Sequence, residues 1–166
     1  MTEVHATIDG DLVMIGFGSI GRGVLPLIER HIGFDRSRFT VIEPSAEFAT
    51  ILQDHGIRHL QAALTPENFA GTLRGLFPQG KGMIVNLSVD VDSIELMKLA
   101  QEIGVLYLDT VVEPWPGFYF GSSLPNAERT NYPLREKVRA LGKSYVGGPT
   151  AVSCCGANPG MVSWLL

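Results

Sequence analysis

Three glycines near the N-terminus have the spacing of a loop that binds a dinucleotide. Gly16, Gly18 and Gly21 form a G-x-G-x-x-G pattern. In such a loop the first glycine permits a tight turn, the second lets the backbone approach a pyrophosphate, and the third lets a helix pack closely on a strand. The backbone N–H groups at Ser19 and Ile20 would then donate to the phosphates from the start of the helix. A plain glycine turn is the alternative, because the chain contains 19 glycines.

An acidic residue follows this loop at the distance expected of a ribose-binding carboxylate. Glu43 lies at the end of the next apolar run, 22 residues after Gly21. A carboxylate in that position accepts hydrogen bonds from a ribose diol and repels a 2′-phosphate, so it predicts NAD rather than NADP. Two alternatives stay open: Glu43 could be a solvated strand end, and Arg22 could serve a 2′-phosphate instead of facing the surface or the pyrophosphate.

The segment NLSVD, residues 86–90, carries polar side chains directly after another apolar run. Asn86 and Ser88 could bond the ribose or the nicotinamide amide of a dinucleotide. Asp90 fits two interpretations equally well, as part of a ligand site or as a helix cap.

The segment DTVVEPWPGFYF, residues 109–120, combines two carboxylates, Asp109 and Glu113, with four aromatic rings. Aromatic faces attract ammonium groups, and a carboxylate beside them pairs with the charge directly, so the segment suits an amine or diamine. A carboxylate in such surroundings can have a raised pKa and exchange protons with an amine. In the plainer alternative the rings cover the sheet edge and Glu113 caps a turn. The rings belong to Trp115, Phe118, Tyr119 and Phe120.

These residues need elements to position them, and apolar runs alternate with amphipathic stretches along the chain. The predicted strands are 12–17, 38–43, 57–62, 82–88, 105–113 and 150–154. The predicted helices are 19–32, 45–56, 65–77, 92–104 and 132–141. Strand followed by helix about six times predicts an α/β fold, a doubly wound parallel sheet of the Rossmann type with helices on both faces. In such sheets ligands bind at the carboxyl ends of the strands.

Local signals mark several helix ends. Ser45, Thr65 and Asp92 are predicted N-caps, and Gly104 is predicted to end the helix that Asp92 begins. Pro26 predicts a kink or an irregular first turn in the first helix. That helix is predicted to bury one apolar face, formed by Ile20, Val24, Leu27, Ile28 and Ile32.

The composition limits the class of protein. The 166 residues suit one domain, and 45% hydrophobic with 18% charged residues indicates a globular chain. A net charge of −4 argues against a nucleic-acid partner. No apolar run approaches the roughly 18 residues that span a membrane, and the first residues do not resemble a signal peptide. Cys154 and Cys155 are adjacent, so a bond between them would be strained, which favours reduced thiols and a cytoplasmic location.

Four segments together resemble the N-terminal part of bacterial homospermidine synthases, which are related to saccharopine-dehydrogenase-like oxidoreductases. The segments are VMIGFGSIGRGVLPLIERH, NLSVD, LYLDTVVEPWPGFYF and TAVSCCGANPGMVSW, and the resemblance runs from about residue 8 to the end. It implies NAD-dependent oxidation of putrescine, exchange of the imine with a second putrescine, and re-reduction to homospermidine, a net aminobutyl transfer. It implies a homodimer for full-length relatives, and the residues themselves show no metal signature.

The resemblance also implies roles for individual residues. The three glycines would hold the pyrophosphate and Glu43 the adenosine ribose. The nicotinamide side would be formed by Asn86, Ser88 and Thr110. The diamine would face Asp90, Glu113 and Asn158. Cys154 and Cys155 match a pair in the family, and close packing in a strand is favoured for them over chemistry, because hydride transfer needs no thiol.

The chain is shorter than the enzymes it resembles, which continue into a second domain. We therefore expect residues 1–157 to form an NAD(P)-binding domain and residues 158–166 to begin a crossover helix toward a catalytic and dimerisation domain. Met161, Val162, Trp164, Leu165 and Leu166 would then form an exposed apolar patch. Two other functions stay open: a non-catalytic dinucleotide-binding fragment, and a carboxynorspermidine-type reductase with Arg129 or Arg135 holding a substrate carboxylate.

Overall fold

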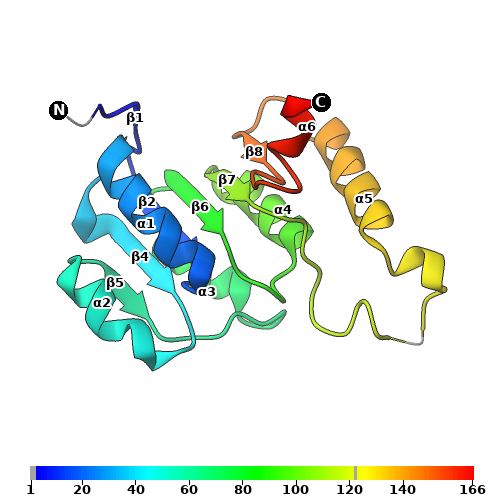
Figure 1. Ribbon diagram of the computed structural model, residues 1–166, viewed down its shortest axis with the longest axis horizontal. Coiled ribbons are helices and arrows are strands. Elements are labelled where there is room, and N and C mark those ends of the chain that lie inside the picture. Colours follow the sequence, from blue (N-terminus) through cyan, green and yellow to red (C-terminus); the bar gives the residue numbers. More distant parts are fainter. Residues whose placement is uncertain (1–2, 122) are drawn as a thin grey trace.

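All six predicted strands are present, and they pair in parallel in one sheet. The computed structural model describes residues 3–121 and 123–166, without the side chain of Trp164. The strand order is β5-β4-β2-β6-β7-β8, so the order reverses between β2 and β6 (Figure 1). The predicted doubly wound fold is therefore confirmed. The bounds are β2 Asp11–Ile15, β4 Phe39–Ile42, β5 Arg58–Leu60, β6 Gly82–Asn86, β7 Leu106–Asp109 and β8 Ala151–Val152.

Helices cover both faces of this sheet. Side chains of α1 (Ser19–His31) and α2 (Ala49–Asp54) join one core cluster, and those of α3 (Phe69–Leu76) and α4 (Ser93–Ile103) join the other. Helix α5 (Asn131–Ser144) packs on the second cluster beside α4. The short elements are η1 Arg36–Arg38, η2 Ala46–Phe48, η3 Asn126–Glu128 and α6 Val162–Leu165. Two short strands that were not predicted, β1 (Ala6–Thr7) and β3 (Ile32–Gly33), pair in parallel outside the main sheet.

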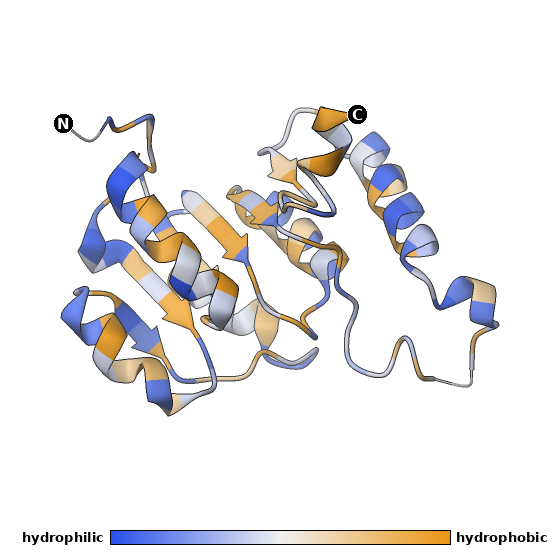
Figure 2. Cartoon of the chain, viewed as in Figure 1, coloured by the Kyte–Doolittle hydropathy of each residue, from blue (hydrophilic) through white to orange (hydrophobic). Residues whose placement is uncertain are grey.

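The central strand shows why the strands read as continuous apolar runs. Leu12 and Met14 belong to the cluster under α1 and α2, whereas Val13 and Ile15 belong to the cluster under α3 and α4. Successive residues of a strand point to opposite faces, and here both faces are buried. Figure 2 shows apolar colour along much of β6, hydrophilic colour on the edge strand β5, and a largely hydrophilic α5 at the side of the molecule.

All six strands end one to four residues before their predicted limits, and the difference at β7 and β8 affects predicted site residues. β7 ends at Asp109 and not at Glu113, because the chain leaves the sheet and binds the start of α4: the Ser93 amide donates to the Glu113 carbonyl at 2.8 Å, and the Glu113 amide donates to Ser93 Oγ at 3.0 Å. β8 contains two residues, so Cys154 and Cys155 lie in the loop after it and not in a strand.

The predicted helix starts were partly confirmed. Asp92 caps α4 by accepting hydrogen bonds from two backbone amides at 2.9 Å, and Gly104 ends that helix with φ +80°. Ser45 caps the short η2 segment that leads into α2. The Thr65 prediction was wrong, because the Asn68 side chain accepts from the Thr65 amide at 2.9 Å and α3 begins only after this turn.

Helix α1 is continuous through Pro26, and its predicted buried face is confirmed only in part, since Val24 and Ile28 pack against the core. Gly21 and Leu25 face the sheet, while Ile20 and Leu27 are 56% and 54% exposed. A Cβ at Gly21 would lie 2.8 Å from the Gly16 carbonyl oxygen, so the helix approaches the strand end through its glycine. This close approach sets the rotation of the helix.

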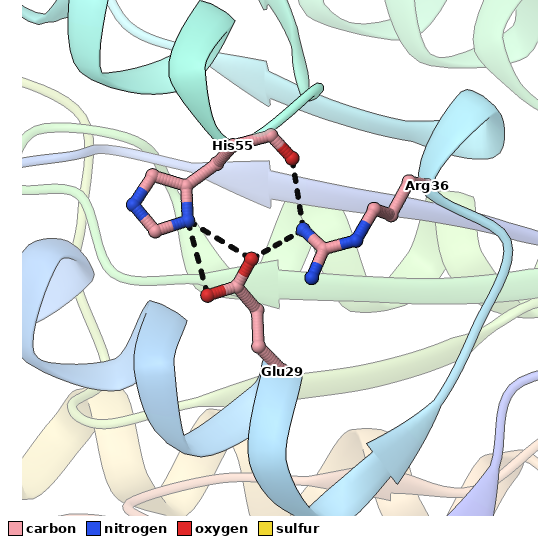
Figure 3. Close-up of polar contacts among 3 residues, drawn as sticks. All are labelled: Glu29, Arg36 and His55. Carbon is pink, nitrogen blue, oxygen red and sulfur yellow. Dashed lines mark hydrogen bonds and ion pairs between the residues drawn. The ribbon is translucent and has the colours of Figure 1, made fainter.

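Three polar side chains tie α1 to the end of α2 (Figure 3). Glu29 on α1 accepts from Arg36 and lies 2.9 Å from Nδ1 of His55, and Arg36 also donates to the His55 carbonyl at 2.8 Å. Burial raises the pKa of Glu29, but the hydrogen bonds from His55 and Arg36 outweigh it, so the pKa lies below its ordinary value. In the described part of the chain, no helix has both the length and the apolar character needed to cross a membrane.

We expect Glu29→Gln to lower the free energy of unfolding by about 1–2 kcal/mol at pH 7, because it weakens hydrogen bonds to a charged acceptor. A carboxylate whose pKa is depressed by folding stabilises the native state above its unfolded pKa and ceases to do so as it becomes protonated. The difference between wild type and variant should therefore shrink as the pH falls below 4.5. Urea unfolding across this pH range measures it.

The control is Glu102→Gln. The Glu102 side chain is 62% exposed and pairs with Arg74 at the surface. Exposed ion pairs contribute about 0–1 kcal/mol, so this variant should unfold near the wild-type midpoint. Equal loss of stability in both variants would contradict a special role for Glu29.

Candidate functional site

A cavity of about 680 Å³ lies at the carboxyl ends of β2, β4 and β6, at the point where the strand order reverses. This is the position at which ligands bind in doubly wound sheets. Its lining includes seven residues that the sequence singled out: Gly16, Gly18, Ser19, Ile20, Glu43, Ser88 and Asp90. Ile20 is an exposed apolar side chain that forms part of this wall, which explains its position outside the core.

The three glycines of the loop are needed for three different reasons. Gly16 has φ +87°, and a Cβ there would lie 2.8 Å from the backbone of Ser88. Gly21 does not line the cavity but allows the approach of α1 described above. Gly18 has no atom within 4 Å of its Cβ position, so the protein itself would tolerate a side chain there. The open space in front of Gly18 is where a ligand could approach the backbone.

The start of α1, after the central strand β2, provides a positive region at the middle of the cavity. Gly18 is the N-cap, and the N–H groups of the first turn are not used by the helix itself. This first turn, all of which the structure describes, carries no acidic side chain. An anion such as a pyrophosphate would therefore meet free donors and the favourable helix dipole.

Glu43 is fixed at the cavity wall by backbone amides. Its Oε2 accepts from the Phe17 amide at 2.8 Å, and its Oε1 accepts from the Ser45 amide at 2.9 Å. His59 Nε2 lies 2.8 Å from the Glu43 carbonyl oxygen and supports the same turn. Each carboxylate oxygen can accept more than one hydrogen bond, so both keep capacity for the hydroxyls of a ribose.

A loop that was not predicted as part of the site forms the opposite wall. Residues 62–65, which follow β5, line the cavity together with Pro44 and Pro116. The sequence suggested a strand end and a helix cap here. Only the position of this loop after the carboxyl end of a strand could have predicted that it lines the cavity. Its small and apolar side chains, Ala62, Ala63 and Leu64, suit the flat face of a base.

Asn86 and Asp90 have different roles from each other. Asn86 is 2% exposed and does not line the cavity; its Oδ1 accepts from Ser88 Oγ at 2.6 Å, so it holds the loop that does. Asp90 is exposed, lines the cavity and has φ +64°. Because Asp92 is the cap of α4, the cap interpretation of Asp90 is wrong.

Glu113 lies near the acidic end of the cavity without lining it. Burial raises the pKa of Glu113, and the negative charges of Asp90 and Asp109 raise it further. Burial likewise raises the pKa of Tyr119, and the charge of Glu113 adds to it. The charges of Asp90 and Asp109 thus act on Glu113, and the charge of Glu113 acts on Tyr119, so negative charge gathers on this side and favours a cationic ligand.

The aromatic wall is smaller than the sequence suggested. Trp115 packs in the core against Phe69, with ring centroids 5.5 Å apart, and Phe120 is 92% exposed. Phe118 contacts Tyr119 edge to face and has the ammonium of Lys137 5.9 Å from its ring centre. Of the four rings, Tyr119 is linked to Glu113 through the effect of the Glu113 charge on its pKa.

The remaining predicted residues lie at the ends of β7 and β8. Thr110 follows β7, and Gly156 packs against it, since a Cβ at Gly156 would lie 3.2 Å from the Thr110 carbonyl oxygen. Asn158 is exposed on the turn that Gly156 and Gly160 close. Neither Thr110 nor Asn158 lines the cavity.

The two cysteines lie in the same loop as this turn. Cys154 is half-buried and Cys155 is exposed, and both are free thiols. The expectation that they pack tightly in a strand was wrong.

The arrangement as a whole fits a dinucleotide. Free amide donors stand after the central strand β2, with a fixed carboxylate at the ribose position after β4 on one side and a group of acids after β6 and β7 on the other. The space in front of Gly18 accommodates the close backbone approach that a pyrophosphate requires.

Comparisons with known proteins agree with this geometry. Residues 12–152 match the family model described as the saccharopine dehydrogenase NADP binding domain. Homospermidine synthases from Blastochloris viridis and Mesorhizobium japonicum are 56% and 53% identical to this chain over 165 residues, or 98% of its length. The chain spans about a third of those relatives, 35% and 34% of their lengths.

A solved structure is also similar. The homospermidine synthase from Legionella pneumophila, crystallised in complex with NAD, superposes with a TM-score of 0.79 at 27% identity. The match covers 95% of this chain and 31% of that one.

We expect Gly18→Ala to weaken NAD binding by about tenfold or more while leaving the thermal unfolding midpoint nearly unchanged. The new methyl group would occupy space that the ligand needs but would not contact any protein atom. Isothermal titration and thermal unfolding measure the two effects. The control is Gly23→Ala, whose Cβ also meets no atom within 4 Å but lies on an exposed part of α1. Unaltered NAD affinity in Gly18→Ala would show that the dinucleotide does not cross this loop.

Proposed function

Because this chain belongs to the family of saccharopine dehydrogenase NADP binding domains, we propose that it is the NAD-binding part of a homospermidine synthase. The observation that carries the proposal is the fixed position of Glu43 beside the glycine loop. A carboxylate held there accepts hydrogen bonds from a ribose diol and repels a 2′-phosphate, so it favours NAD over NADP. The identities of 56% and 53% with two homospermidine synthases support the reaction.

When bound, NAD would accept a hydride from the carbon that bears the amine of putrescine and later return it. The oxidised substrate is an imine, the amine of a second putrescine adds to its carbon, and ammonia leaves. Return of the hydride then gives homospermidine with no net oxidation. The start of α1 would hold the pyrophosphate and Glu43 the adenosine ribose, while Ser88 and Thr110 would lie on the nicotinamide side. Asn86 would act there by holding the Ser88 hydroxyl.

The acidic side of the cavity would receive the diamine. Glu113 would pair with an ammonium group, and its raised pKa would let it take up and release a proton near the amine. Asp90 would provide a second negative charge at the cavity, and Asn158 would orient the reacting nitrogen. These roles place an acidic surface beside a substrate that carries two positive charges.

Two further expectations belong to the whole enzyme. We propose that it acts in the cytoplasm, and that full-length relatives form homodimers.

A carboxynorspermidine-type reductase has less support, because it requires an arginine for a substrate carboxylate. Arg129 donates instead to the Tyr119 carbonyl at 3.1 Å and to the Asn126 side chain, and Arg135 is exposed on α5.

The proposal is tested by joining residues 1–166 to the part of the Blastochloris viridis relative that follows its matching segment. With NAD and putrescine, this fusion protein should form homospermidine, detected by mass spectrometry. Residues 1–166 alone should bind NAD about tenfold more tightly than NADP but form no product at enzymatic rates, since water is not excluded from the site. A fusion that binds NAD without making homospermidine would refute the reaction, and equal affinity for NADP would refute the role of Glu43.

In the same fusion protein, Glu113→Gln should lower kcat by about 100-fold or more, because it removes both the charge and the proton acceptor. NAD affinity should stay unchanged, since Glu113 does not line the cavity. Steady-state kinetics and NAD titration separate the two quantities. Glu128→Gln, at an exposed position in η3, is the matched control and should leave kcat unchanged. Wild-type kinetics in Glu113→Gln would remove this residue from the site.

A further inference from the structure

A buried chain of hydrogen bonds runs beneath the site from the end of β6 to the loop after β8. Asn86 Nδ2 donates to Tyr107 Oη at 3.4 Å, and Tyr107 Oη donates to Asp109 Oδ2 at 2.9 Å. Asp109 Oδ1 accepts from Ser153 Oγ at 2.7 Å and from the Cys154 amide at 2.8 Å. The path therefore crosses β7 and joins two loops that lie far apart in the sequence.

Asp109 is an unusual residue for a protein core. It is fully buried, and none of the ion pairs formed among residues 3–121 and 123–166 includes it. Burying an unpaired carboxylate is unfavourable, and an apolar side chain would fill the position at less cost. Three donors converge on the carboxylate, which indicates that its acceptor capacity is what the position requires.

The two loops that this chain joins share one backbone feature. Asp90 in the loop after β6 has φ +64°, and Cys154 in the loop after β8 has φ +63°. Within the described part of the protein, these are the non-glycine residues with positive φ. Such conformations persist only where surrounding contacts enforce them, and they concentrate at functional sites. Asn86 holds the first loop by accepting a hydrogen bond from the Ser88 hydroxyl, and Asp109 holds the second by accepting one from the Cys154 amide.

The register of the strands makes this coupling direct. Asn86 and Asp109 are paired residues on β6 and β7, and Tyr107 lies on the same face of β7 as Asp109, two residues before it. The backbone of Asp109 also accepts from the Cys155 amide at 2.8 Å. A displacement of the Asp109 side chain would therefore move the turn that carries Asn158.

We propose that Asp109 is a positioning residue that, through Tyr107 and Asn86, fixes the Asn158 turn relative to the cavity loop formed by residues 87–90. The proposal rests on the proposed function, because Asn158 is the group whose position would matter to the diamine. Asp109 itself touches neither the cavity nor the diamine. Its effect is on the geometry of the residues that do.

The first measurement uses this chain alone and does not depend on catalysis. Asp109→Leu fills the space without acceptors, so amide hydrogen exchange at Cys154 and Cys155 should become about tenfold faster or more. Asp109→Asn keeps an acceptor for Cys154 and Ser153 and should restore most of the protection. Tyr107→Phe should accelerate exchange at Ser88 and at Cys154 together, because it removes the link between the loops.

The second measurement uses the fusion protein. Asp109→Leu should lower kcat about 100-fold while the affinity for NAD changes little, because misplacement of a positioning group affects the reacting geometry and not cofactor binding. Asp109→Asn should recover kcat to within about fivefold of wild type, as expected where the acceptor and not the charge is needed. If Asp109→Leu does not fold, Ser153→Ala and Tyr107→Phe each remove one donor and provide the same readouts.

The outcomes separate the two proposals. A wild-type fusion protein without homospermidine synthesis would refute the proposed function, while the exchange data on the chain alone would still decide whether Asp109 couples the loops. Unchanged exchange at Cys154 in Asp109→Leu, or at both loops in Tyr107→Phe, would overturn the positioning role. Parallel loss of NAD affinity and kcat would overturn it too, since it would indicate a general structural defect.

Discussion

The close approach of the backbone at Gly16 and Gly21 is the constraint on which the rest of the site depends. Any side chain at Gly16 would meet Ser88, and any side chain at Gly21 would meet Gly16. These two contacts bring the end of β2, the start of α1 and the loop after β6 together. They also determine which face of α1 is buried, so that Leu25 enters the core and Ile20 faces the cavity.

The charges around the cavity that results are ordered along the sheet. Unused amides at the start of α1, which follows the central strand β2, favour negative charge, whereas Asp90 and Glu113 place negative charge on the side of β6 and β7. Glu43 follows β4, on the other side of α1 from these acids, and is held by the Phe17 and Ser45 amides, so its carboxylate keeps its position without a ligand. A molecule with a ribose at Glu43, phosphates at α1 and a cationic partner beside the acids matches this distribution better than a uniformly charged ligand does.

Much of this arrangement could be predicted from the sequence, because it follows from local patterns. Apolar runs identified the six strands, Asp92 and Gly104 the ends of α4, and the glycine spacing the loop at the cavity. Contacts between distant segments could not be predicted. Residues 110–113 have strand-like side chains, yet they leave the sheet because the Glu113 backbone bonds the amide and the hydroxyl of Ser93. Trp115 was predicted to line a pocket, but its ring packs against Phe69 on α3 at the core.

Contacts between distant segments also explain why the sequence did not predict the loop at residues 62–65 as a cavity wall or Asn86 as a buried support. Nothing in their immediate sequence distinguishes a cavity wall from an ordinary turn, or a cofactor contact from a buried support. Only the pairing of β6 with β7 brings Asn86 beside Tyr107 and turns its side chain away from the ligand space. The order of β2 beside β6 has a kinetic consequence as well. Asp11 pairs with Gly82, so the long chain between them must close before the central pair of strands can form. During synthesis on the ribosome, the glycine loop therefore cannot make its Ser88 contact until the segment through Ser88 has been made and β6 has paired with β2.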